Sequence, residues 1–371
     1  MSDLIPISDG LPISDGLENV VAAQTVLSEV DGAAGRLILR GHALEDIAGH
    51  TDFAQAVRLM FDGFFPDLPS NAGLTAALGQ ARVEVFGEVA ALDKTLISRS
   101  PTEALRALMA RLADGDDLPT ALRLLAAPAV FTPAIARAQR GLAPVAPDAS
   151  LPHAQDILRM MTGETASATQ AAALDAYLVT VCDHGLNAST FAARVVASTR
   201  AGLTSAVLAG LSALKGPLHG GAPGPVIDML DEIGDAAHAK AWLEAALERG
   251  DRLMGFGHRI YRVRDPRADA LKRAIRKLDA TAGRLAYAEA VEAAALAILR
   301  ERKPNRSLQT NVEFYTALLL EALAFPPDTF TCVFAMGRTI GWLAHAREQI
   351  AGGKLVRPQS VYVGPMPKQA A

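Results

Sequence analysis

The sequence predicts a mainly α-helical fold with one small β-hairpin near the N-terminus. Half of the 371 residues are hydrophobic and alanine is very abundant, whereas only 5% are aromatic. Runs of β-branched residues are few, and apolar residues recur at spacings of three and four along much of the chain, as expected for packed helices. A chain of this length can form two domains around a large buried core.

Charge and cysteine content argue against several classes of protein. The formal net charge of −4 and the pI of about 6.1 do not suit a general nucleic-acid-binding protein. The two cysteines, Cys182 and Cys332, are too few for a disulfide framework, which indicates a reducing compartment. The N-terminus lacks the pattern of a signal peptide. We expect Pro128 and Pro133 to interrupt the longest apolar stretch, so a cytoplasmic protein without a membrane span is predicted.

The N-terminal part of the chain is expected to be an arm, a hairpin and a helical scaffold. Residues 1–17 contain Pro-Ile-Ser-Asp-Gly twice, at 6–10 and 12–16, and each copy predicts a turn in an extended arm. Two short apolar stretches flank Asp31-Gly32 within residues 29–41, which predicts the hairpin. Apolar residues at helical spacing predict helices over 53–64, 72–86, 101–113 and 118–127, followed by a proline-containing loop over 141–152.

Two histidines lie between helices in the middle of the chain. Residues 169–214 carry few charges, as expected for helices that are buried on most sides, and Asp183-His184 lies between two of them. A buried Asp-His pair needs hydrogen-bond partners, so His184 is either a structural residue or part of a site. His219 lies within residues 215–225, of which seven of eleven are Gly or Pro. We interpret this segment as a fixed loop that presents an imidazole.

The stretch 254–267 carries the strongest indication of an active site. Gly255 and Gly257 allow the backbone to turn and to approach a ligand closely, and His258 is suited to proton transfer near neutral pH. Between residues 252 and 277, nine Lys or Arg stand against two Asp, a local charge of +7. Such a cluster is costly unless it meets anions. A solvated basic helix is the alternative, but it needs neither the glycines nor the Asp265-Pro266 break.

The C-terminal third adds one acid and two arginines. Glu313 is the single acid in a largely apolar run that ends at residue 320. Burial raises the pKa of a carboxyl and would make Glu313 a candidate base, while a salt bridge to a nearby Arg is a comparable interpretation. Arg338 lies in a helix expected over 330–348, where a buried Arg needs a carboxylate. Arg357 lies in a short extended tail and is a second anion-binding candidate.

Seven short blocks spread over nearly the whole chain form a recognisable pattern. They are Gly-Arg-Leu-Ile at 35–38 with Arg40-Gly41, Asp183-His184 with Asn-Ala-Ser-Thr at 187–190, Gly-Pro-Leu-His-Gly-Gly at 216–221, Gly-Phe-Gly-His-Arg at 255–259 with Asp-Pro-Arg at 265–267, Asn-Val-Glu-Phe-Tyr at 311–315, Gly341-Trp342 with His345, and Arg357-Pro358 with Tyr-Val-Gly at 362–364. In residues, order and approximate spacing, these blocks resemble the citrate synthase family.

The resemblance implies a nearly all-α, two-domain fold whose domains close over the substrates. It places a large domain at 1–219 and 319–371 and a small domain at 220–318, with the active-site cleft between them. The family condenses acetyl-CoA with oxaloacetate, using no metal and no permanently bound cofactor, so the CoA thioester is a co-substrate. A homodimer is implied in which Arg357 reaches the partner's site, and no nucleic acid or membrane partner is implied.

The resemblance also implies a role for each matched residue. His219 would hold the thioester carbonyl and stabilise the enol, His258 would protonate the oxaloacetate carbonyl, and Glu313 occupies the place of the catalytic base. Oxaloacetate would be bound by His184, Arg267, Arg338 and Arg357. The backbone of Met254, Gly255, Phe256 and Gly257 would face the adenine of CoA. From charge alone, we assign Lys272, Arg273 and Arg276 to the phosphates of CoA.

Five positions at or beside the matched residues depart from the family's usual pattern. Glu313 stands in place of Asp, and the others are Gly185 for Glu, Pro223 for Asn, Thr310 for Pro and Gln359 for Arg. One extra methylene moves a carboxylate by about 1 to 1.5 Å, and a misplacement near 1 Å can cost on the order of 100-fold in rate. Two alternatives therefore stay open: 2-methylcitrate synthesis from propionyl-CoA, and a catalytically weak relative that binds oxaloacetate or CoA as a sensor or partner.

Overall fold

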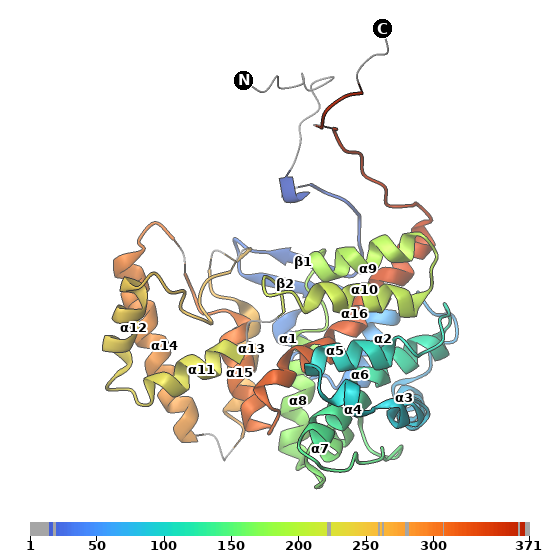
Figure 1. The fold of residues 1–371 in the computed structure, drawn as a ribbon, viewed down its shortest axis with the longest axis horizontal. Helices are drawn as coiled ribbons and strands as arrows, with labels where there is room; N and C mark the ends of the chain where they lie inside the picture. The colour runs from blue at the N-terminus through green and yellow to red at the C-terminus, as the bar shows by residue number, and fades with distance from the viewer. Residues whose placement is uncertain are drawn as a thin grey trace.

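The computed structural model is built almost entirely from helices, with one three-stranded sheet (Figure 1). It describes residues 15–17, 20–220, 224–258, 260–261, 263–278, 282–306, 308–362 and 364–367. The arrangement confirms the mainly α fold predicted from composition and spacing. The predicted duplication in the N-terminal arm lies outside the described residues except for its end, where Asp15–Leu17 form a short 3-10 turn.

Most helices lie close to where the apolar spacing predicts them. The helices of the N-terminal half are α1 (Leu44–Ile47), α2 (Phe53–Phe61), α3 (Asn71–Phe86), α4 (Lys94–Ile97), α5 (Pro101–Met109), α6 (Leu118–Gln139), α7 (His153–Thr162) and α8 (Ala168–Thr180). Those of the C-terminal half are α9 (Ala188–Ser198), α10 (Leu203–Leu214), α11 (Gly224–Ile233), α12 (Ala239–Glu248), α13 (Pro266–Ile275), α14 (Ala282–Arg302), α15 (Val312–Ala322) and α16 (Phe330–Gly352).

The predicted hairpin is confirmed and gains a third strand. Strand β1 (Ser28–Asp31) pairs antiparallel with β2 (Arg36–Leu39), and β2 pairs antiparallel with β3 (His42–Ala43). The Asp31 carboxylate accepts hydrogen bonds from two backbone N–H groups in the turn, and Gly35 closes the turn with a φ of +64°. The turn is therefore fixed by one Asp side chain and one left-handed glycine.

Helix α6 shows where the prediction from prolines was wrong. The sequence predicts that this helix ends before Pro128, yet α6 continues through Pro128 and Pro133 to Gln139. Both prolines are buried, so packing around them outweighs the hydrogen bonds that their missing N–H groups cannot make. Leu118–Gln139 is consequently the one described helix long and apolar enough to cross a membrane, and 83% of its most apolar window is buried inside the protein.

Helix α16 forms the centre of the larger part of the molecule. Its residues are buried from Phe330 to Ala346 except for a few on one side, and it packs against α6, α8, α9 and α10. Two glycines allow this close packing: a Cβ at Gly337 would lie 2.6 Å from the Leu178 carbonyl oxygen, and one at Gly341 would lie 2.4 Å from the Cys182 carbonyl oxygen. The close approach brings the residues that follow α8, including His184, against Arg338 of α16.

Helices α11 to α15 lie together at one end of the molecule (Figure 1). The helical region predicted after residue 225 is divided into α11 and α12, which are separated at Gly234, a residue with a φ of +77°. Residues 254–257 form a loop that pairs with the segment before α15, through an antiparallel bridge between Phe256 and Thr310. The domain limits given above, at 219/220 and 318/319, stay a prediction.

Candidate active site

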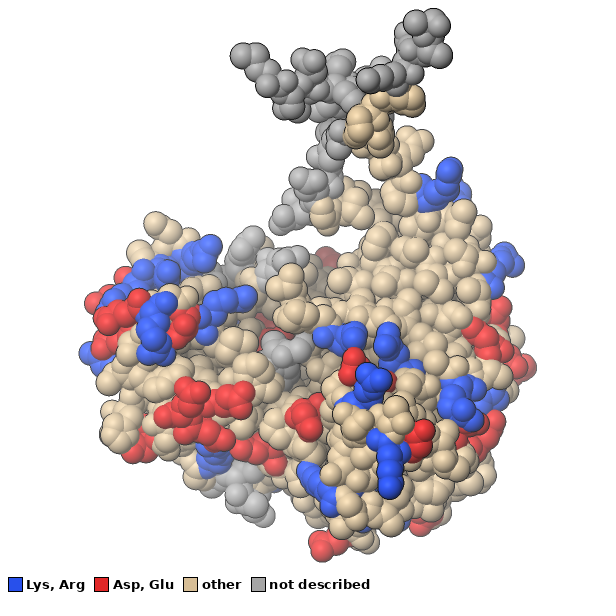
Figure 2. All heavy atoms as spheres, in the orientation of Figure 1, with Lys and Arg blue, Asp and Glu red and all other residues tan. Residues whose placement is uncertain are grey.

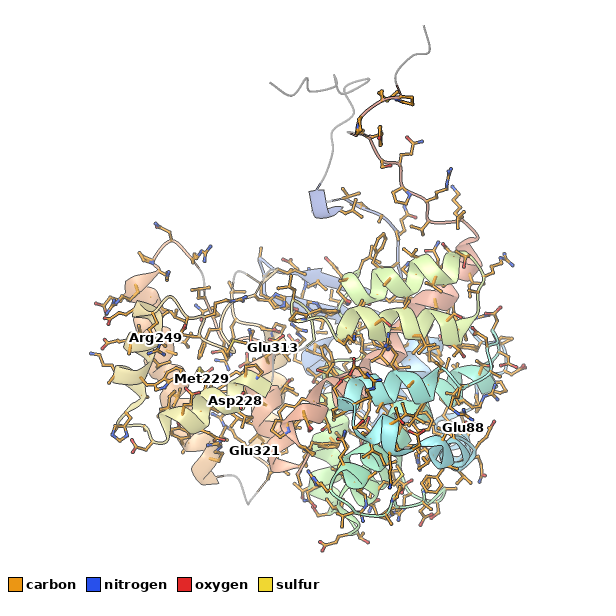
Figure 3. The ribbon with its side chains drawn as sticks, in the orientation of Figure 1. Glu88, Asp228, Met229, Arg249, Glu313 and Glu321 are labelled. Atoms are coloured by element: carbon orange, nitrogen blue, oxygen red, sulfur yellow. The ribbon has the colours of Figure 1, made fainter. Side chains whose placement is uncertain are left out.

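Six predicted site residues come together from separate parts of the chain. His184 follows α8, His219 follows α10, His258 precedes α13, Arg267 and Glu313 lie in the first turns of α13 and α15, and Arg338 lies in α16. Contacts connect several of them: the rings of His184 and His258 are 5.6 Å apart, and His219 and Glu313 line one pocket. Glu313 is among the labelled side chains in Figure 3, where it lies between the two parts of the molecule.

Arg267 is held rigidly by the residue that caps its own helix. Asp265 is the N-cap of α13, and its carboxylate accepts hydrogen bonds from the Arg267 backbone N–H at 3.0 Å, from Nε at 3.0 Å and from Nη2 at 2.7 Å. Arg267 is only 4% exposed, and although burial alone lowers the pKa of a guanidinium, Asp265 raises the pKa of Arg267 above its usual value. The guanidinium is therefore a fixed positive charge.

His258 faces Arg267 with its protonated nitrogen. Its Nδ1 accepts backbone N–H bonds from Ile260 at 3.0 Å and Tyr261 at 3.1 Å, so the proton of the neutral ring lies on Nε2. That Nε2 is 3.2 Å from Arg267 Nη2, which is also a donor. Burial, with the Arg267 charge, lowers the pKa of His258 to about 4. Two donors thus converge where one acceptor oxygen of a ligand would satisfy both.

His219 is oriented by a hydroxyl that is itself oriented by an indole. His219 Nε2 lies 2.8 Å from Ser189 Oγ, and Trp342 Nε1 donates to the same oxygen at 3.1 Å. Asn187 Oδ1 is the other acceptor for the Ser189 proton, at 2.8 Å, but already accepts two backbone N–H bonds as the N-cap of α9. The Ser189 proton is therefore available to His219 Nε2, which leaves His219 Nδ1 as the donor toward the pocket. Burial, then Arg338 and Arg267, lower the pKa of His219 to about 4.

Glu313 and His219 line the same pocket. The pocket is lined by Tyr177, Val181, His219, Gly220, Val312, Glu313, Thr316 and Phe334. Burial raises the pKa of the Glu313 carboxyl, and the Arg267 charge opposes this effect. One carboxylate oxygen, Oε2, has no hydrogen-bond partner among the described residues. The predicted salt bridge is not among the described ion pairs, so the geometry favours the interpretation of Glu313 as a base.

Arg338 and His184 complete one side of the site. Arg338 is 1% exposed; its Nε donates to the Val181 carbonyl oxygen at 2.7 Å, while its Nη2 is buried without a partner among the described residues. Burial lowers the pKa of Arg338 to about 10, so it stays charged at neutral pH. His184 Nε2 lies 3.1 Å from the Tyr261 hydroxyl, and burial with the nearby arginines lowers the pKa of His184 well below its usual value. An unpaired buried guanidinium nitrogen indicates an anionic ligand.

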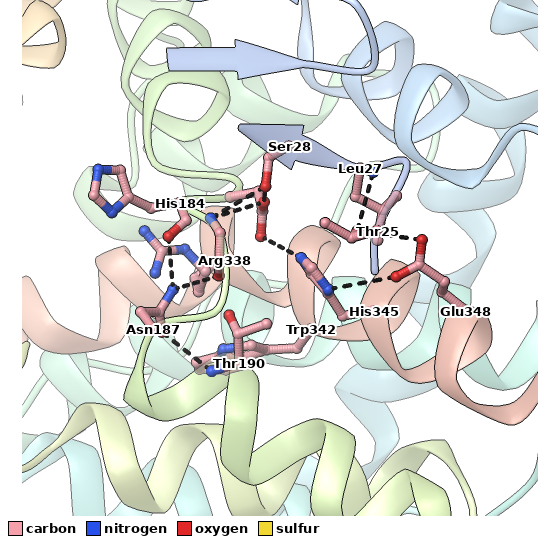
Figure 4. Close-up of polar contacts among 12 residues, drawn as sticks. Thr25, Leu27, Ser28, His184, Asn187, Thr190, Arg338, Trp342, His345 and Glu348 are labelled. Atoms are coloured by element: carbon pink, nitrogen blue, oxygen red, sulfur yellow. Dashed lines mark hydrogen bonds and ion pairs between the residues drawn. The ribbon is translucent and has the colours of Figure 1, made fainter. Parts of the chain in front are cut away.

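Asp183, next to His184, is fixed by a buried network that includes Ser28 and His345, which are labelled in Figure 4. Its carboxylate accepts hydrogen bonds from Ser28 Oγ and the Gly185 N–H, and His345 Nε2 lies 3.2 Å from its Oδ1. His345 Nδ1 faces Arg194 Nη1 at 2.9 Å, so the His345 proton is on the Asp183 side. Burial alone would raise the pKa of the Asp183 carboxyl, but His345, Ser28 and other partners lower it overall.

The described residues contain no group of three or more His, Cys, Asp or Glu that could hold a metal ion. The site is instead made of histidines, arginines and one buried carboxyl, and comparison with known proteins places this set in a family. Residues 16–359 match the family described as "Citrate synthase, C-terminal domain". The chain belongs to the citrate synthase family.

Relatives that carry this family's names align over nearly their whole length. Citrate synthase of Haloferax volcanii is 37% identical over 368 residues, covering 94% of this chain and 95% of the relative. 2-Methylcitrate synthase of Mycobacterium tuberculosis is 34% identical over 361 residues, covering 94% and 90%. Crystal structures agree: citrate synthase of Thermotoga maritima has a TM-score of 0.83 at 30% identity, over 97% of this chain and 98% of that one.

A further related structure is a complex with ligands. It is citrate synthase of Thermoplasma acidophilum in a ternary complex with carboxymethyl coenzyme A and oxaloacetate. It matches with a TM-score of 0.83 at 27% identity, over 97% of this chain and 98% of that one. A CoA derivative and oxaloacetate are therefore bound together in one protein that shares this fold.

The loop that the citrate synthase resemblance assigns to CoA is built by backbone pairing. Gly257 N–H donates to the Gln309 carbonyl at 2.7 Å, and Asn311 N–H donates to the Gly255 carbonyl at 3.0 Å. Gly255 and Gly257 both have a φ of +84°, and a Cβ at Gly255 would lie 2.8 Å from the Phe314 ring. Met254 is partly exposed beside them. These glycines are therefore required for the turn and for its approach to α15.

The three cations assigned to CoA phosphates differ in what surrounds them. Lys272 Nζ lies 3.0 Å from Glu289 and 3.2 Å from Glu292, and Arg276 Nη2 lies 2.8 Å from Glu289. Arg273 is exposed on the same helix. On the face shown in Figure 2, Lys and Arg side chains lie interspersed with Asp and Glu side chains over the outer end of α12 and α14. The assignment of these three residues to CoA stays a prediction.

Arg357 is placed apart from the other predicted site residues. It is exposed in the extended segment after α16, which leaves the body of the molecule beside the N-terminal segment (Figure 1). Arg259 belongs to a matched block and Pro223 lies beside one. Both lie outside the described residues. The structure of this single chain therefore assembles His184, His219, His258, Arg267, Glu313 and Arg338, and does not bring Arg357 to them.

Three supporting residues were not assigned to the site from the sequence. Ser189 orients His219, Tyr261 contacts His184 and donates its backbone N–H to His258, and Asp265 holds Arg267. Ser189 and Asp265 lie inside the matched blocks. Their position in the sequence near site residues is therefore the feature that could have indicated their role. Tyr261 had no such signal, because a buried Tyr next to a loop is also typical of ordinary core packing.

Proposed function

We propose that the protein condenses an acyl-CoA thioester, acetyl-CoA first, with oxaloacetate to give citrate and CoA. The observation that carries this proposal is the pocket that both Glu313 and a neutral His219 line, together with the paired donors of His258 and Arg267. A weakly acidic α-proton needs a base on one side and a hydrogen-bond donor to the thioester oxygen on the other. This arrangement supplies both.

Each step uses a group described above. Glu313 takes the α-proton of the thioester while His219 Nδ1–H donates to the thioester oxygen, which forms the enol. The enol carbon attacks the ketone carbon of oxaloacetate, the enol proton returns to His219 Nδ1, and the ketone oxygen takes the proton of His258 Nε2. Water then adds to the thioester carbonyl and the C–S bond breaks. Of the two protons of this water, one restores His258 and the other protonates the departing CoA thiolate, while Glu313 releases the α-proton to solvent. Because the pKa of both histidines is near 4, both rings are neutral at pH 7 and can donate without first losing a charge.

Oxaloacetate suits the cationic side of this site. Arg267 is a fixed guanidinium, Arg338 has a buried Nη2 without a described partner, and both charges lower the pKa of His184. Two carboxylates of one small molecule would neutralise the two guanidinium groups. The ketone oxygen would then lie between His258 Nε2 and Arg267 Nη2, where two donors converge.

Propionyl-CoA is the second candidate acyl donor. A relative named 2-methylcitrate synthase is 34% identical, close to the 37% of a relative named citrate synthase. Beside the two catalytic side chains, the pocket is lined mainly by apolar groups such as Val181, Val312 and Phe334, which fit a methyl or an ethyl group. One methylene changes binding by only about 1 to 3 kcal/mol, so acyl preference is decided by a measurement.

We further propose a homodimer in which Arg357 enters the site of the second copy. The segments beside it expose apolar side chains that a single chain leaves uncovered, with Val21 at 89%, Tyr362 at 63% and Met366 at 68%. Exposed apolar residues that gather on two neighbouring segments are typical of an interface. We also propose a cytoplasmic location, from the two free, buried cysteines.

Release of free thiol from CoA tests the function. The purified protein is given acetyl-CoA or propionyl-CoA, each with and without oxaloacetate, beside the His258→Ala variant as control. Oxaloacetate-dependent release by the wild type supports the condensation, and the higher kcat/KM identifies the acyl donor. Ligand-dependent thermal stabilisation without any thiol release would instead support the weak, ligand-binding relative.

A further inference from the structure

A buried carboxylate lies behind the segment that carries the catalytic base. Glu292 of α14 is 5% exposed. Its Oε1 accepts a hydrogen bond from Thr310 Oγ1 at 2.6 Å, and its Oε2 accepts one from the Tyr315 hydroxyl at 2.6 Å. Lys272 Nζ of α13 lies 3.2 Å from the same Oε2. Both oxygens of Glu292 are therefore engaged, by three groups from two different parts of the chain.

The two hydroxyl groups lie on either side of Glu313 in the chain. Thr310 precedes Asn311, the N-cap of α15, and Tyr315 lies within the first turn of that helix. Glu292 thus holds the chain just before and just after Glu313. The other side of the same segment is fixed by backbone bonds to the loop of Gly255 and Gly257.

The start of α15 has no side-chain cap of its own. Asn311 occupies the N-cap position, but its Nδ2 donates to the Gly257 carbonyl at 2.9 Å and its side chain makes no cap hydrogen bond. The first turn of a helix without a cap is the part that frays most readily. The contacts of Glu292 with Thr310 and Tyr315 therefore hold this turn through two side-chain hydroxyls.

We propose that Glu292 is a positioning residue for Glu313, acting through Thr310 and Tyr315. The base must reach the α-carbon of the thioester, and an error of about 1 Å in its position can cost on the order of 100-fold in rate. A Glu at this position has one more rotatable bond than an Asp, so it depends more on a fixed backbone. Stability alone does not require Glu292, because a buried ionic network is often no more stable than an apolar packing of the same volume.

The same network connects the base to a residue that binds the other substrate. Lys272 lies in α13, the helix whose first turn carries Arg267, and its ammonium also lies 5.2 Å from the centre of the Tyr315 ring. Glu292 therefore sets the start of α15 relative to α13. We expect its loss to affect the proton-removal step more than the binding of oxaloacetate, because Arg267 is independently held by Asp265.

Thr310→Val tests the proposal with a small change, since valine keeps the shape of threonine and removes its hydroxyl. This test rests on the proposed function, and turnover of oxaloacetate with acetyl-CoA by the wild type is the condition for interpreting it. We expect kcat to fall about 10-fold or more, an unchanged dissociation constant for oxaloacetate, and a larger primary isotope effect with methyl-deuterated acetyl-CoA. Thr310→Ser, which keeps the hydroxyl, should restore both kcat and the isotope effect.

Thr204→Val is the matched control for a lost buried hydroxyl. Thr204 is 3% exposed at the start of α10, and its Oγ1 donates to the Ala113 carbonyl at 3.1 Å. This variant should lower the melting temperature without changing the isotope effect. If Thr310→Val and Glu292→Gln also lower the melting temperature and leave the isotope effect unchanged, Glu292 has only a structural role and the proposal is wrong. Absence of turnover in the wild type would contradict the proposed function itself.

Discussion

Ser189 Oγ lies 2.8 Å from His219 Nε2 and accepts a hydrogen bond from Trp342 Nε1. An indole N–H can only donate, so the Ser189 proton points away from Trp342, and Asn187 Oδ1, the other acceptor in reach, already accepts two backbone N–H bonds. We therefore assign the Ser189 proton to His219 Nε2, which leaves the proton of the neutral ring on Nδ1, toward the pocket.

Ser189→Ala should lower kcat by about 10- to 100-fold, because loss of a buried hydrogen bond costs about 1 to 3 kcal/mol. The variant also removes the group that keeps the His219 proton on Nδ1. Steady-state kinetics measure this change, with circular dichroism to check the fold. Trp342→Phe keeps the Ser189 hydroxyl and should have the smaller effect on kcat. Equal activity of Ser189→Ala and the wild type would contradict this role of Ser189.

Glu313→Gln should remove the base without changing the size of the side chain. We expect kcat to fall by about 100- to 10,000-fold, the usual contribution of a positioned acid or base. Oxaloacetate should still stabilise the variant against heat, because Arg267 and Arg338 are unchanged. Glu313→Asp keeps a carboxylate but withdraws it by about 1.5 Å, and we expect its kcat to lie between those of the Gln variant and the wild type. A Gln variant with near wild-type kcat would exclude Glu313 as the base.

Activity should fall in acid because Glu313 becomes protonated, not because a histidine becomes charged. Burial raises the pKa of Glu313 above 4.5, whereas it lowers the pKa of His219 and of His258 to about 4. All three groups work in their deprotonated forms, so kcat/KM should rise with pH through the pKa of Glu313 and then become constant. A profile of kcat/KM against pH measures this rise, and its midpoint should move to lower pH in the Glu313→Asp variant. If the midpoint does not move in that variant, the rise belongs to another group.

How much of this site the sequence predicts depends on the kind of contact. His219, His258 and Arg267 lie in Gly- or Pro-rich, charged segments whose composition is unusual for scaffold, so they stand out. Ser189 does not, because its role depends on a contact with a residue 30 positions away. Glu292 lies in an ordinary helical pattern, and only the folded chain brings Thr310 and Tyr315 to it.

The fold was predictable from local spacing except where packing outweighs a local preference. Helix α6 is the clear example, since its two prolines predict a break and its burial maintains the helix. The short strand β3 is another, because two residues carry too little pattern to be recognised and pair only once β2 is in place.

Arg273 offers a test of the assignment of cations to CoA. It is exposed on α13, while Lys272 and Arg276 share the Glu289 carboxylate. If Arg273 contacts the 3′-phosphate, Arg273→Ala should raise KM for acetyl-CoA by about 5- to 10-fold, as for the loss of one charge-assisted hydrogen bond. The KM for the dephospho analogue should not change. Arg111→Ala is the control, because Arg111 pairs with Glu88 in the other part of the molecule (Figure 3).

Arg357 distinguishes a site made by one chain from a site shared by two. If each site combines His258 of one copy with Arg357 of the other, then Arg357→Ala and His258→Ala should each be nearly inactive as homodimers. A mixed dimer of the two variants has one site with both changes and one site with neither. Two-step purification through different affinity tags isolates the mixed dimer, which should recover about half of the wild-type kcat per dimer. No recovery in a mixed dimer of confirmed composition, or full activity of Arg357→Ala alone, would show that Arg357 does not act across subunits.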